Sequence, residues 1–297
     1  MATINNISNS FVTWYNFATE SGRSEYVTDT ICGIQKDFCL PIYDVYDLSF
    51  QVQVTTNIDL LDPANLPPIY RNDPVPPPFV VPLTGVIAKV NLVGTNTYNI
   101  WFTFFASNLL DGLFDGDCFT LSIVFDESSN FVSNQCFKKI ADKCLTTRVT
   151  YFNNENAFGF DYRVAVIQIN PPPAPPLILP TINAVRLPFY LKEPIISSDK
   201  NVYVRSDGSR KLLSARLSKK YKALVDHVPE EVHQNLVVAL NHDEVTFYPD
   251  NITNGIRVRF EDEYNNNFPE VMQNVSIWSA DFTIFETPFN NFNSNCS

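Results

Sequence analysis

The stretch Asn201-Val202-Tyr203-Val204-Arg205-Ser206-Asp207-Gly208-Ser209-Arg210 decides how this chain is expected to fold. Its β-branched and aromatic residues favour a strand, and they stop at an Asp-Gly pair. Beyond the pair, Leu213, Ala215 and Leu217 alternate with polar residues. Asp-Gly between two such runs is a strong hairpin signal, because both residues accept the positive φ angles of a tight turn. The sequence therefore predicts a β-hairpin followed by a long half-buried strand that reaches Val225.

A helix and three further strands are predicted after this long strand. Pro229 and the two glutamates after it are typical of a helix start, where proline fits and acids face the positive end of the dipole. Val232, Leu236 and Leu240 recur every four residues, so a helix over about 229–241 packs one apolar stripe on a sheet. Alternating patterns predict the three later strands at 244–248, 256–261 and 278–284.

Strand patterns also recur through the first half of the chain, separated by turn residues. Spacings of this kind are typical of a β-sandwich. We therefore predict a mainly β protein with two β-sandwich or barrel-like domains, the second with one packed α-helix. The expected strands of the first half lie at 49–54, 86–92, 98–105, 118–125 and 146–152.

Two proline-rich stretches suggest how the domains are divided. The stretch at 170–182 stands where the pattern changes, and consecutive prolines are stiff and extended, as in a linker. A PxxP ligand for a recognition module is the less favoured interpretation. We expect a β-sandwich domain over 1–169, with a proline-rich loop at about 64–82. A smaller β-rich domain with an extended C-terminal tail is expected over 183–297.

Composition excludes several classes of protein. Of the 297 residues, 45% are hydrophobic and 18% charged, the reverse of the balance found in disordered chains. The net charge of −11 provides no basic field for nucleic acid, so direct nucleic-acid binding is not expected. Membrane insertion is not expected either, since no apolar run reaches about 18 residues. Residues 1–6 lack the features of a signal peptide, so we expect assembly in a cytoplasm.

The six cysteines leave two interpretations open. Without an export signal, we favour free and mostly buried thiols over three disulfides. Because the chain has no CxxC pair, the signal for zinc is weak, and we expect no cofactor and no metal. The cysteines are Cys32, Cys39, Cys118, Cys136, Cys144 and Cys296.

No catalytic constellation is recognisable, and we predict that the chain is not an enzyme. The three histidines, His227, His233 and His242, match no metal motif and are expected at the surface or at a helix cap. The acidic run at 111–117 lacks the spacing of an EF-hand, so an Asp-Gly turn is favoured over calcium binding. Glycoside hydrolysis needs only two carboxylates close in space, and nothing selects a pair. The ordinary candidates are Glu193, Glu230, Glu231 and Glu244.

Three groups of residues are candidate contacts to other proteins. A basic cluster interleaves with the long strand; it either discourages edge pairing or binds an acidic neighbouring subunit. Loop aromatics (Tyr43, Tyr46, Tyr70 and Phe79) either stack on sugars or, as we favour, belong to the core. The asparagine-rich tail cannot fold alone, so it frays or docks on a neighbour. The partner-contact candidates are Arg210, Lys211, Arg216, Lys219, Lys220, Lys222, Pro76, Pro77, Phe289 and Phe292.

Several segments, taken in order, resemble one group of proteins. They are Gly116-Asp117-Cys118-Phe119-Thr120-Leu121, Asn156-Ala157-Phe158-Gly159-Phe160-Asp161-Tyr162, Val185-Arg186-Leu187-Pro188-Phe189-Tyr190-Leu191, Leu217-Ser218-Lys219-Lys220-Tyr221, Val228-Pro229-Glu230, Leu240-Asn241-His242-Asp243-Glu244-Val245 and Asn293-Ser294-Asn295-Cys296. Over about 110–297, the chain resembles virion structural proteins of tailed bacteriophages of gut Bacteroidetes, including crAss-like phages.

This resemblance implies a non-enzymatic building block of the tail. The chain is then expected in the virion as a tail or tail-hub/ring component, forming a homo-oligomer and joining neighbouring tail layers. It carries over no catalytic residues. A receptor- or glycan-binding tail protein is the alternative function, and loop aromatics exposed to solvent would favour it.

Overall fold

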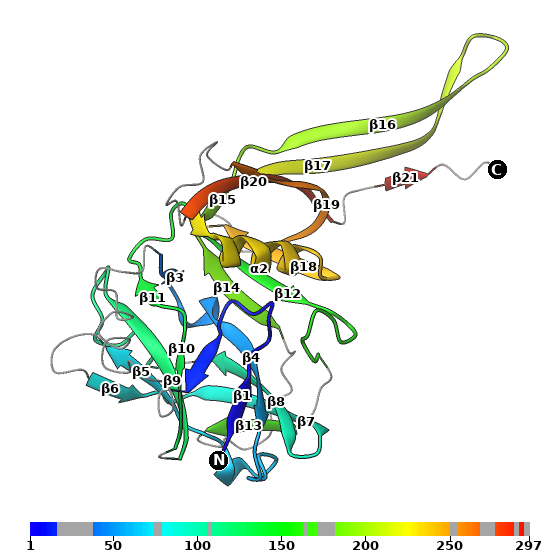
Figure 1. The fold of residues 1–297 in the computed structure, drawn as a ribbon. Coiled ribbons are helices and arrows are strands. Elements are labelled where there is room, and N and C mark those ends of the chain that lie inside the picture. Colours follow the sequence, from blue (N-terminus) through cyan, green and yellow to red (C-terminus); the bar gives the residue numbers. More distant parts are fainter. Residues whose placement is uncertain are drawn as a thin grey trace.

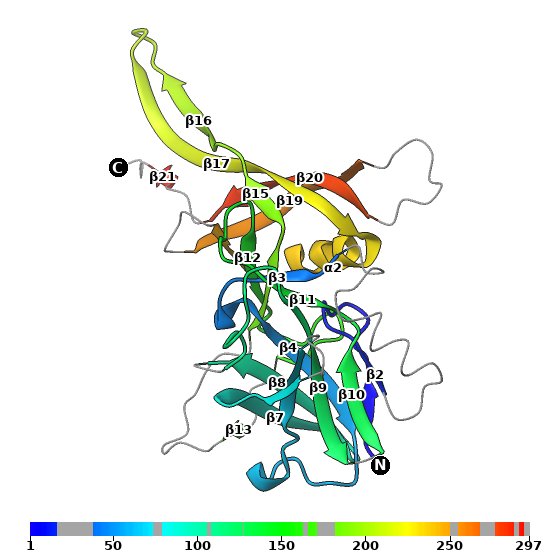
Figure 2. The same cartoon turned by 90° about the vertical axis from the view of Figure 1, so that its left-hand side faces the viewer.

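The computed structural model describes ten stretches of the chain. They form a β-rich body with one long arm, which leaves the end of the body that carries helix α2 (Glu230–Leu240) (Figures 1 and 2). The stretches are 1–16, 38–73, 79–105, 108–126, 128–162, 166–170, 182–249, 255–267, 277–287 and 291–293.

One sheet of 14 strands runs through both halves of the sequence. Eleven of its strands form a continuous path, and three short or peripheral strands pair from the side. The path is β13 (Val166–Asn170), β7 (Val86–Gly94), β8 (Thr97–Phe104), β4 (Ser49–Thr55), β14 (Asn183–Leu187), β12 (Thr147–Phe152), β18 (Glu244–Pro249), β19 (Ile256–Asn267), β20 (Ile277–Glu286), β17 (Arg210–Pro229) and β15 (Phe189–Leu191). The others are β1 (Thr3–Asn5) on β4, and β16 (Ile195–Val204) and β21 (Asn291–Asn293) on β17.

A second sheet of seven strands covers the first in the N-terminal half. Trp14 in this second sheet contacts Phe50 on β4, and Phe50 in turn contacts Phe102 and Phe104 on β8. These rings are buried between the sheets, which is the arrangement of a β-sandwich. The strands are β2 (Trp14–Asn16), β10 (Ser129–Ser133), β9 (Cys118–Asp126), β11 (Phe137–Lys139), β3 (Leu40–Ile42), β5 (Ile69–Asp73) and β6 (Phe79–Pro82). Two 3₁₀-helices connect this sheet to β4 of the first: η1 (Val45–Asp47) lies between β3 and β4, and η2 (Pro63–Asn65) lies between β4 and β5.

The prediction of a mainly β fold with one packed α-helix is confirmed. Pro229 caps helix α2, and Val232, Leu236 and Leu240 are buried, as their spacing predicts. The helix contacts β17, β19 and β20, which arch over it in Figure 1. Within the described residues, no helix is both long and apolar enough to cross a bilayer.

Strand β12 lies between strands that come from the other side of the proline-rich stretch. It pairs with β14 on one side and with β18 on the other, although it precedes both in sequence. A single residue pair, Ala184 with Ser49, connects β14 to β4. The two halves therefore share one sheet. The division at 170–182 stays a prediction, because 171–181 lie outside the described residues.

The stretch 64–82, expected to be a proline-rich loop, contains two strands. Strands β5 and β6 pair with each other, and β5 also pairs with β9. The register sets Tyr70 opposite Pro82 and Asp73 opposite Phe79. Proline is tolerated there because Pro82 ends the edge strand β6, where no further ladder donor is needed.

Candidate functional site

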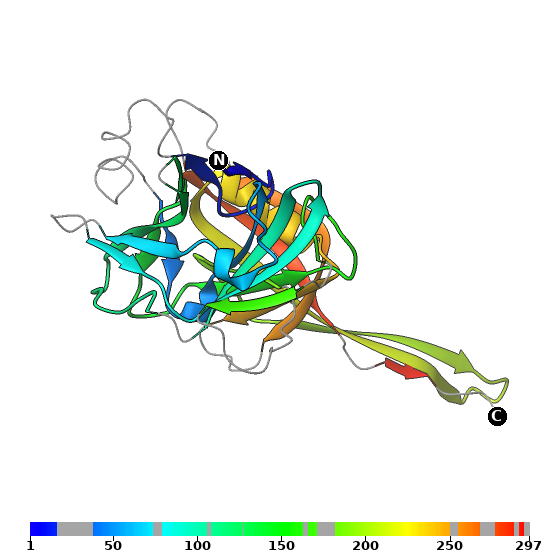
Figure 3. The same cartoon turned by 90° about the horizontal axis from the view of Figure 1, so that it is seen from below.

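The most distinctive feature of the molecule is a β arm, residues 195–222, formed by β16 and the first part of β17. Its paired strands run from Ile195 opposite Lys220 out to Val204 opposite Arg210. All three views show most of this hairpin projecting from the body (Figures 1, 2 and 3). At the tip, Gly208 has a φ of 81° and donates its N–H to the Arg205 carbonyl. The predicted Asp-Gly hairpin is thus confirmed.

Part of the C-terminal tail lies along the arm as a third strand. Strand β21 pairs antiparallel with β17, Phe292 opposite Ala215 and Asn293 opposite Ser214. Because β16 pairs with the other edge of β17, the long strand is central in this part of the arm. The described piece of the tail therefore docks on the arm of its own chain.

Large apolar side chains are exposed along the arm. Ile195 and Ile196 near its root are 65% and 63% exposed, and Tyr203 near its tip is 55% exposed. Val202, Val204 and Leu212 are also exposed. A hairpin without a core of its own is marginally stable in water, so an arm of this kind gains stability from a covering surface.

The charge of the arm is opposite to that of the rest of the molecule. Eight Lys or Arg and two Asp give the arm a formal charge of +6, and the remaining 13 Lys or Arg and 30 Asp or Glu carry −17. In its outer part, no ion pair joins Lys200, Arg205, Arg210 or Lys211 to any other described residue.

The basic residues at the root of the arm are bound to strand β20 instead. Lys219 pairs with Glu286 at 2.8 Å and Lys222 with Asp281 at 3.0 Å, while the Lys220 ammonium lies 4.6 Å from the Phe285 ring centre. The hydrogen bond to Glu286 raises the pKa of Lys219. These three predicted contact residues thus lie where the arm meets the body and contact β20 of their own chain.

Only some of the other partner-contact candidates lie within the described residues. Arg210 and Lys211 lie near the tip, with Arg210 exposed. Arg216 is placed by the backbone of β17 and Phe292 by that of β21. Pro76, Pro77 and Phe289 lie outside the described residues. As contacts, all ten candidates stay predictions.

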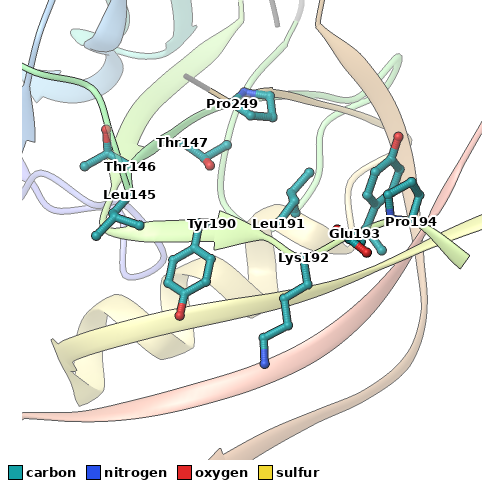
Figure 4. Close-up of a pocket in the computed structure, with 10 residues that line it drawn as sticks. Leu145, Thr146, Thr147, Tyr190, Leu191, Lys192, Glu193, Pro194 and Pro249 are labelled. Carbon is teal, nitrogen blue, oxygen red and sulfur yellow. The ribbon is translucent and has the colours of Figure 1, made fainter. Parts of the chain in front are cut away.

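A pocket of about 420 Å³ lies at the root of the arm (Figure 4). Of the glutamates considered for hydrolysis, Glu193 alone is among its lining residues, whereas Glu230 and Glu231 begin α2 and Glu244 begins β18. The pocket therefore offers one carboxylate, one ammonium (Lys192) and several hydroxyls. The lining residues are Leu145, Thr146, Thr147, Tyr190, Leu191, Lys192, Glu193, Pro194, Tyr221 and Pro249.

A group of aromatic side chains is exposed around helix η1. Tyr43 and Tyr46 are 40% and 46% exposed, and the Tyr46 ring meets that of Phe105 edge-on at 6.0 Å. Of the other loop aromatics, Tyr70 is half-buried on β5, and the side chain of Phe79 lies outside the described part of the structure. The sequence expectation that these aromatics belong to the core is wrong for Tyr43 and Tyr46, because the short turn at η1 leaves both in solvent.

Two of the histidines are buried, which corrects the expectation of surface positions. His233 is stacked on Trp278; its Nε2 donates to the Trp278 carbonyl, so Nδ1 accepts from the Tyr264 hydroxyl. His242 does cap α2 through Nδ1 and the Val238 carbonyl, but it lies among aromatic rings. Burial lowers the pKa of both histidines. One ring nitrogen of each histidine donates to a backbone carbonyl, that of Trp278 on β20 for His233 and that of Val238 on α2 for His242.

The acidic run at 111–117 forms turns, as predicted. Gly112 and Gly116 have positive φ angles of 75° and 90°. The Asp117 carboxylate accepts from the Phe114 N–H and the Asp115 carboxylate from the Ala141 N–H. The two carboxylates thus close the turns against the backbone.

The cysteines differ from the expectation of free thiols at two positions. Cys118 and Cys136 are disulfide-bonded. The pairing of β9 with β11, with Phe119 opposite Phe137, brings them together although the sequence separates them widely. Cys144 is exposed rather than buried, and Cys32 and Cys296 lie outside the described residues.

No protein-family model matches the chain, and no curated protein matches it.

Proposed function

We propose that this chain is a structural subunit of a tailed-bacteriophage virion, a tail or tail-hub/ring component whose arm joins one copy to the next. The observation that carries the proposal is the arm, a basic hairpin with exposed apolar residues on an otherwise acidic chain. The ordered set of segments that resemble crAss-like phage tail proteins supports the assignment to a virion.

Charge complementarity selects a second copy as the partner of the arm. An arm of charge +6 is attracted to a body of charge −17, and every copy carries both. Contacts between two different surfaces of the same protein are head-to-tail, and they close into a ring when the rotation between copies permits. In such a ring the exposed residues Ile195, Ile196 and Tyr203 would become covered.

The root of the arm fits this role mechanically. Lys219 and Lys222 bind Glu286 and Asp281 on β20, so a force on the arm is passed to the main sheet rather than to a loop. The tail strand β21 adds a third strand to the arm. A subunit that links neighbouring tail layers needs an arm that is firmly connected to its body.

Cryo-electron microscopy of purified virions tests the proposal. We expect several symmetric copies of this chain in the tail, each with residues 195–222 lying against the body of another copy. Absence of the chain from the particle would contradict the virion role. Copies whose arms extend into solvent would contradict the joining role.

The exposed aromatic group of Tyr43, Tyr46 and Phe105 supports receptor or glycan binding as a second candidate function. Exposed aromatic rings stack on the apolar faces of sugars, and large exposed apolar groups often mark binding sites. Binding to a glycan array that is lost in Tyr43→Ala/Tyr46→Ala, with assembly unchanged, would favour this function. An array without binding would contradict it.

A further inference from the structure

Three cysteines from distant parts of the sequence meet at one edge of the second sheet. The sulfur atoms of Cys39, Cys118 and Cys136 all lie within 4.8 Å of one another. Cys118 and Cys136 are buried and Cys39 is half-buried. The fourth described cysteine, Cys144, is exposed and outside this cluster.

The backbone fixes this meeting point. Cys39 and Cys136 directly precede β3 and β11, which pair in parallel with Leu40 opposite Phe137. The Leu40 N–H donates to the Cys136 carbonyl at 2.8 Å. Cys118 is the first residue of β9, the antiparallel neighbour of β11 on its other side. Cys39 is level with Cys136, and Cys118, opposite Lys138, lies two residues further along the β9–β11 pair. Three adjacent strands therefore contribute one sulfur each to the cluster.

We propose that these three cysteines, once the disulfide is reduced, form a binding site for a thiophilic divalent cation, with Zn²⁺ as the natural occupant. Tetrahedral Zn²⁺ with Zn–S bonds of about 2.3 Å places its sulfurs about 3.8 Å apart, which suits three sulfurs gathered within 4.8 Å. Three thiolates are soft donors and select Zn²⁺ over Mg²⁺ or Ca²⁺. Water completes the coordination.

Reduction and metal binding balance as two separate steps. A phosphine reductant transfers two electrons to the Cys118 and Cys136 sulfurs, which take up two protons as their disulfide opens, and water oxygen converts the phosphine to its oxide. Zn²⁺ then displaces the protons of the three thiols, so that three protons are released and three Zn–S bonds form. The site is thus available only to the reduced protein.

The cation would stabilise an edge of the sheet that has few hydrogen bonds. Strands β3 and β11 have only three residues each and pair in parallel, so they contribute few hydrogen bonds. In the oxidised protein Cys118 and Cys136 are disulfide-bonded, whereas Cys39 is not. A metal bound by all three sulfurs would connect β3 to β9 and β11.

Cobalt binding tests the proposal, because Co²⁺ occupies thiolate zinc sites and reports them by its absorption. The full-length chain, reduced with the phosphine and kept free of oxygen, is titrated with Co²⁺ and then with Zn²⁺. We expect one equivalent of Co²⁺ to give a thiolate-to-cobalt charge-transfer band that Zn²⁺ abolishes. No band, or the same band before reduction, would overturn the proposal.

Variants identify which cysteines bind the cation. Cys39→Ser, which keeps the disulfide for folding in its oxidised form, should weaken Zn²⁺ binding at least about 100-fold, since even loss of an outer partner of a ligand costs 10–100-fold. Cys144→Ser is the matched control and should bind as the unmodified chain does. Equal affinity in Cys39→Ser, or equal loss in Cys144→Ser, would overturn the assignment.

Discussion

The guanidinium of Arg186 and the carboxylate of Asp47 join the two halves of the sequence inside the body. Nε of Arg186 lies 2.7 Å from Oδ2 of Asp47 and Nη2 lies 2.9 Å from Oδ1, a bidentate pair that is almost fully buried. Oδ2 also accepts the N–H groups of Tyr43 and Asp44. Strand β14 is thereby fixed to helix η1, beside the single residue pair that connects β14 to β4.

Removing one partner of this ion pair should destabilise the whole fold. In Asp47→Asn the Arg186 charge stays buried without its counter-ion, and breaking such a pair costs about 3–5 kcal/mol. Urea unfolding followed by circular dichroism measures the loss. Asp281→Asn is the control, because its pair with Lys222 is more exposed and should cost about 1 kcal/mol or less. Equal losses in the two variants would show that the Arg186 pair is not structural.

The buried histidines should make the protein sensitive to mild acid. Burial lowers the pKa of His233 and His242 in the folded protein. Near pH 6.5 and below, these two histidines therefore bind protons in the unfolded chain but not in the folded one. The free energy of unfolding should therefore fall as the pH decreases through about 6.5. Thermal unfolding at a series of pH values measures this dependence.

Substituting the buried histidines separates their effect from general acid sensitivity. His233→Gln/His242→Gln should flatten the pH dependence between about 5 and 7, even if it lowers stability at neutral pH. His227→Gln is the control, since His227 is exposed. A pH dependence unchanged in the double variant would contradict the assignment.

Lys89 should oppose folding at neutral pH. Its side chain is buried on β7, its Nζ finds no hydrogen-bond partner among the described residues, and burial lowers its pKa to about 8. Lys89→Met should therefore stabilise the fold by about 3 kcal/mol at pH 7, since burial lowers the pKa from 10.5 to about 8 and one pKa unit corresponds to about 1.4 kcal/mol.

The advantage of Lys89→Met should depend on pH in a defined direction. Below about pH 8 Lys89 is charged in both states and the cost is complete. As the pH rises towards about 10.4, the unfolded chain loses the same proton and the two proteins converge. Urea unfolding at pH 7 and pH 10 compares them. A variant less stable than the parent at pH 7 would contradict this account.

Charge reversal at the arm tip should weaken self-association. Arg210→Glu/Lys211→Glu changes the arm from +6 to +2 and brings acids towards an acidic partner. Light scattering at low salt should show fewer oligomers than for the parent, whose own oligomers should dissociate as salt screens the contact. Lys138→Glu/Lys143→Glu makes the same change of charge on the body and should have less effect. An equal effect of both double variants would point to net charge alone.

Local features of this fold could be predicted from the sequence, whereas long-range pairings could not. The Asp207-Gly208 hairpin and the helix after Pro229 depend on residues close in sequence, and both are present. The position of β12 between β14 and β18 depends on pairings across the proline-rich stretch, which periodicity does not encode.

The candidate sites show the same distinction. The basic residues of the arm follow from the sequence, but only the structure separates Lys219 and Lys222, which are paired with β20, from Arg210 near the tip. The cluster of Cys39, Cys118 and Cys136 is formed by strand pairing, so the spacing of the cysteines along the chain does not predict it.

Sedimentation velocity of the purified chain with and without its arm tests the central claim most directly. Ile196 pairs with Lys219, so replacing 197–218 by Asn-Gly shortens the hairpin to a two-residue turn that its strands accept. The full chain should sediment as oligomers at low salt and the shortened chain as a monomer with unchanged circular dichroism of the body. Oligomers of the same size for both chains, or a full chain that remains monomeric, would contradict the proposal that the arm joins copies.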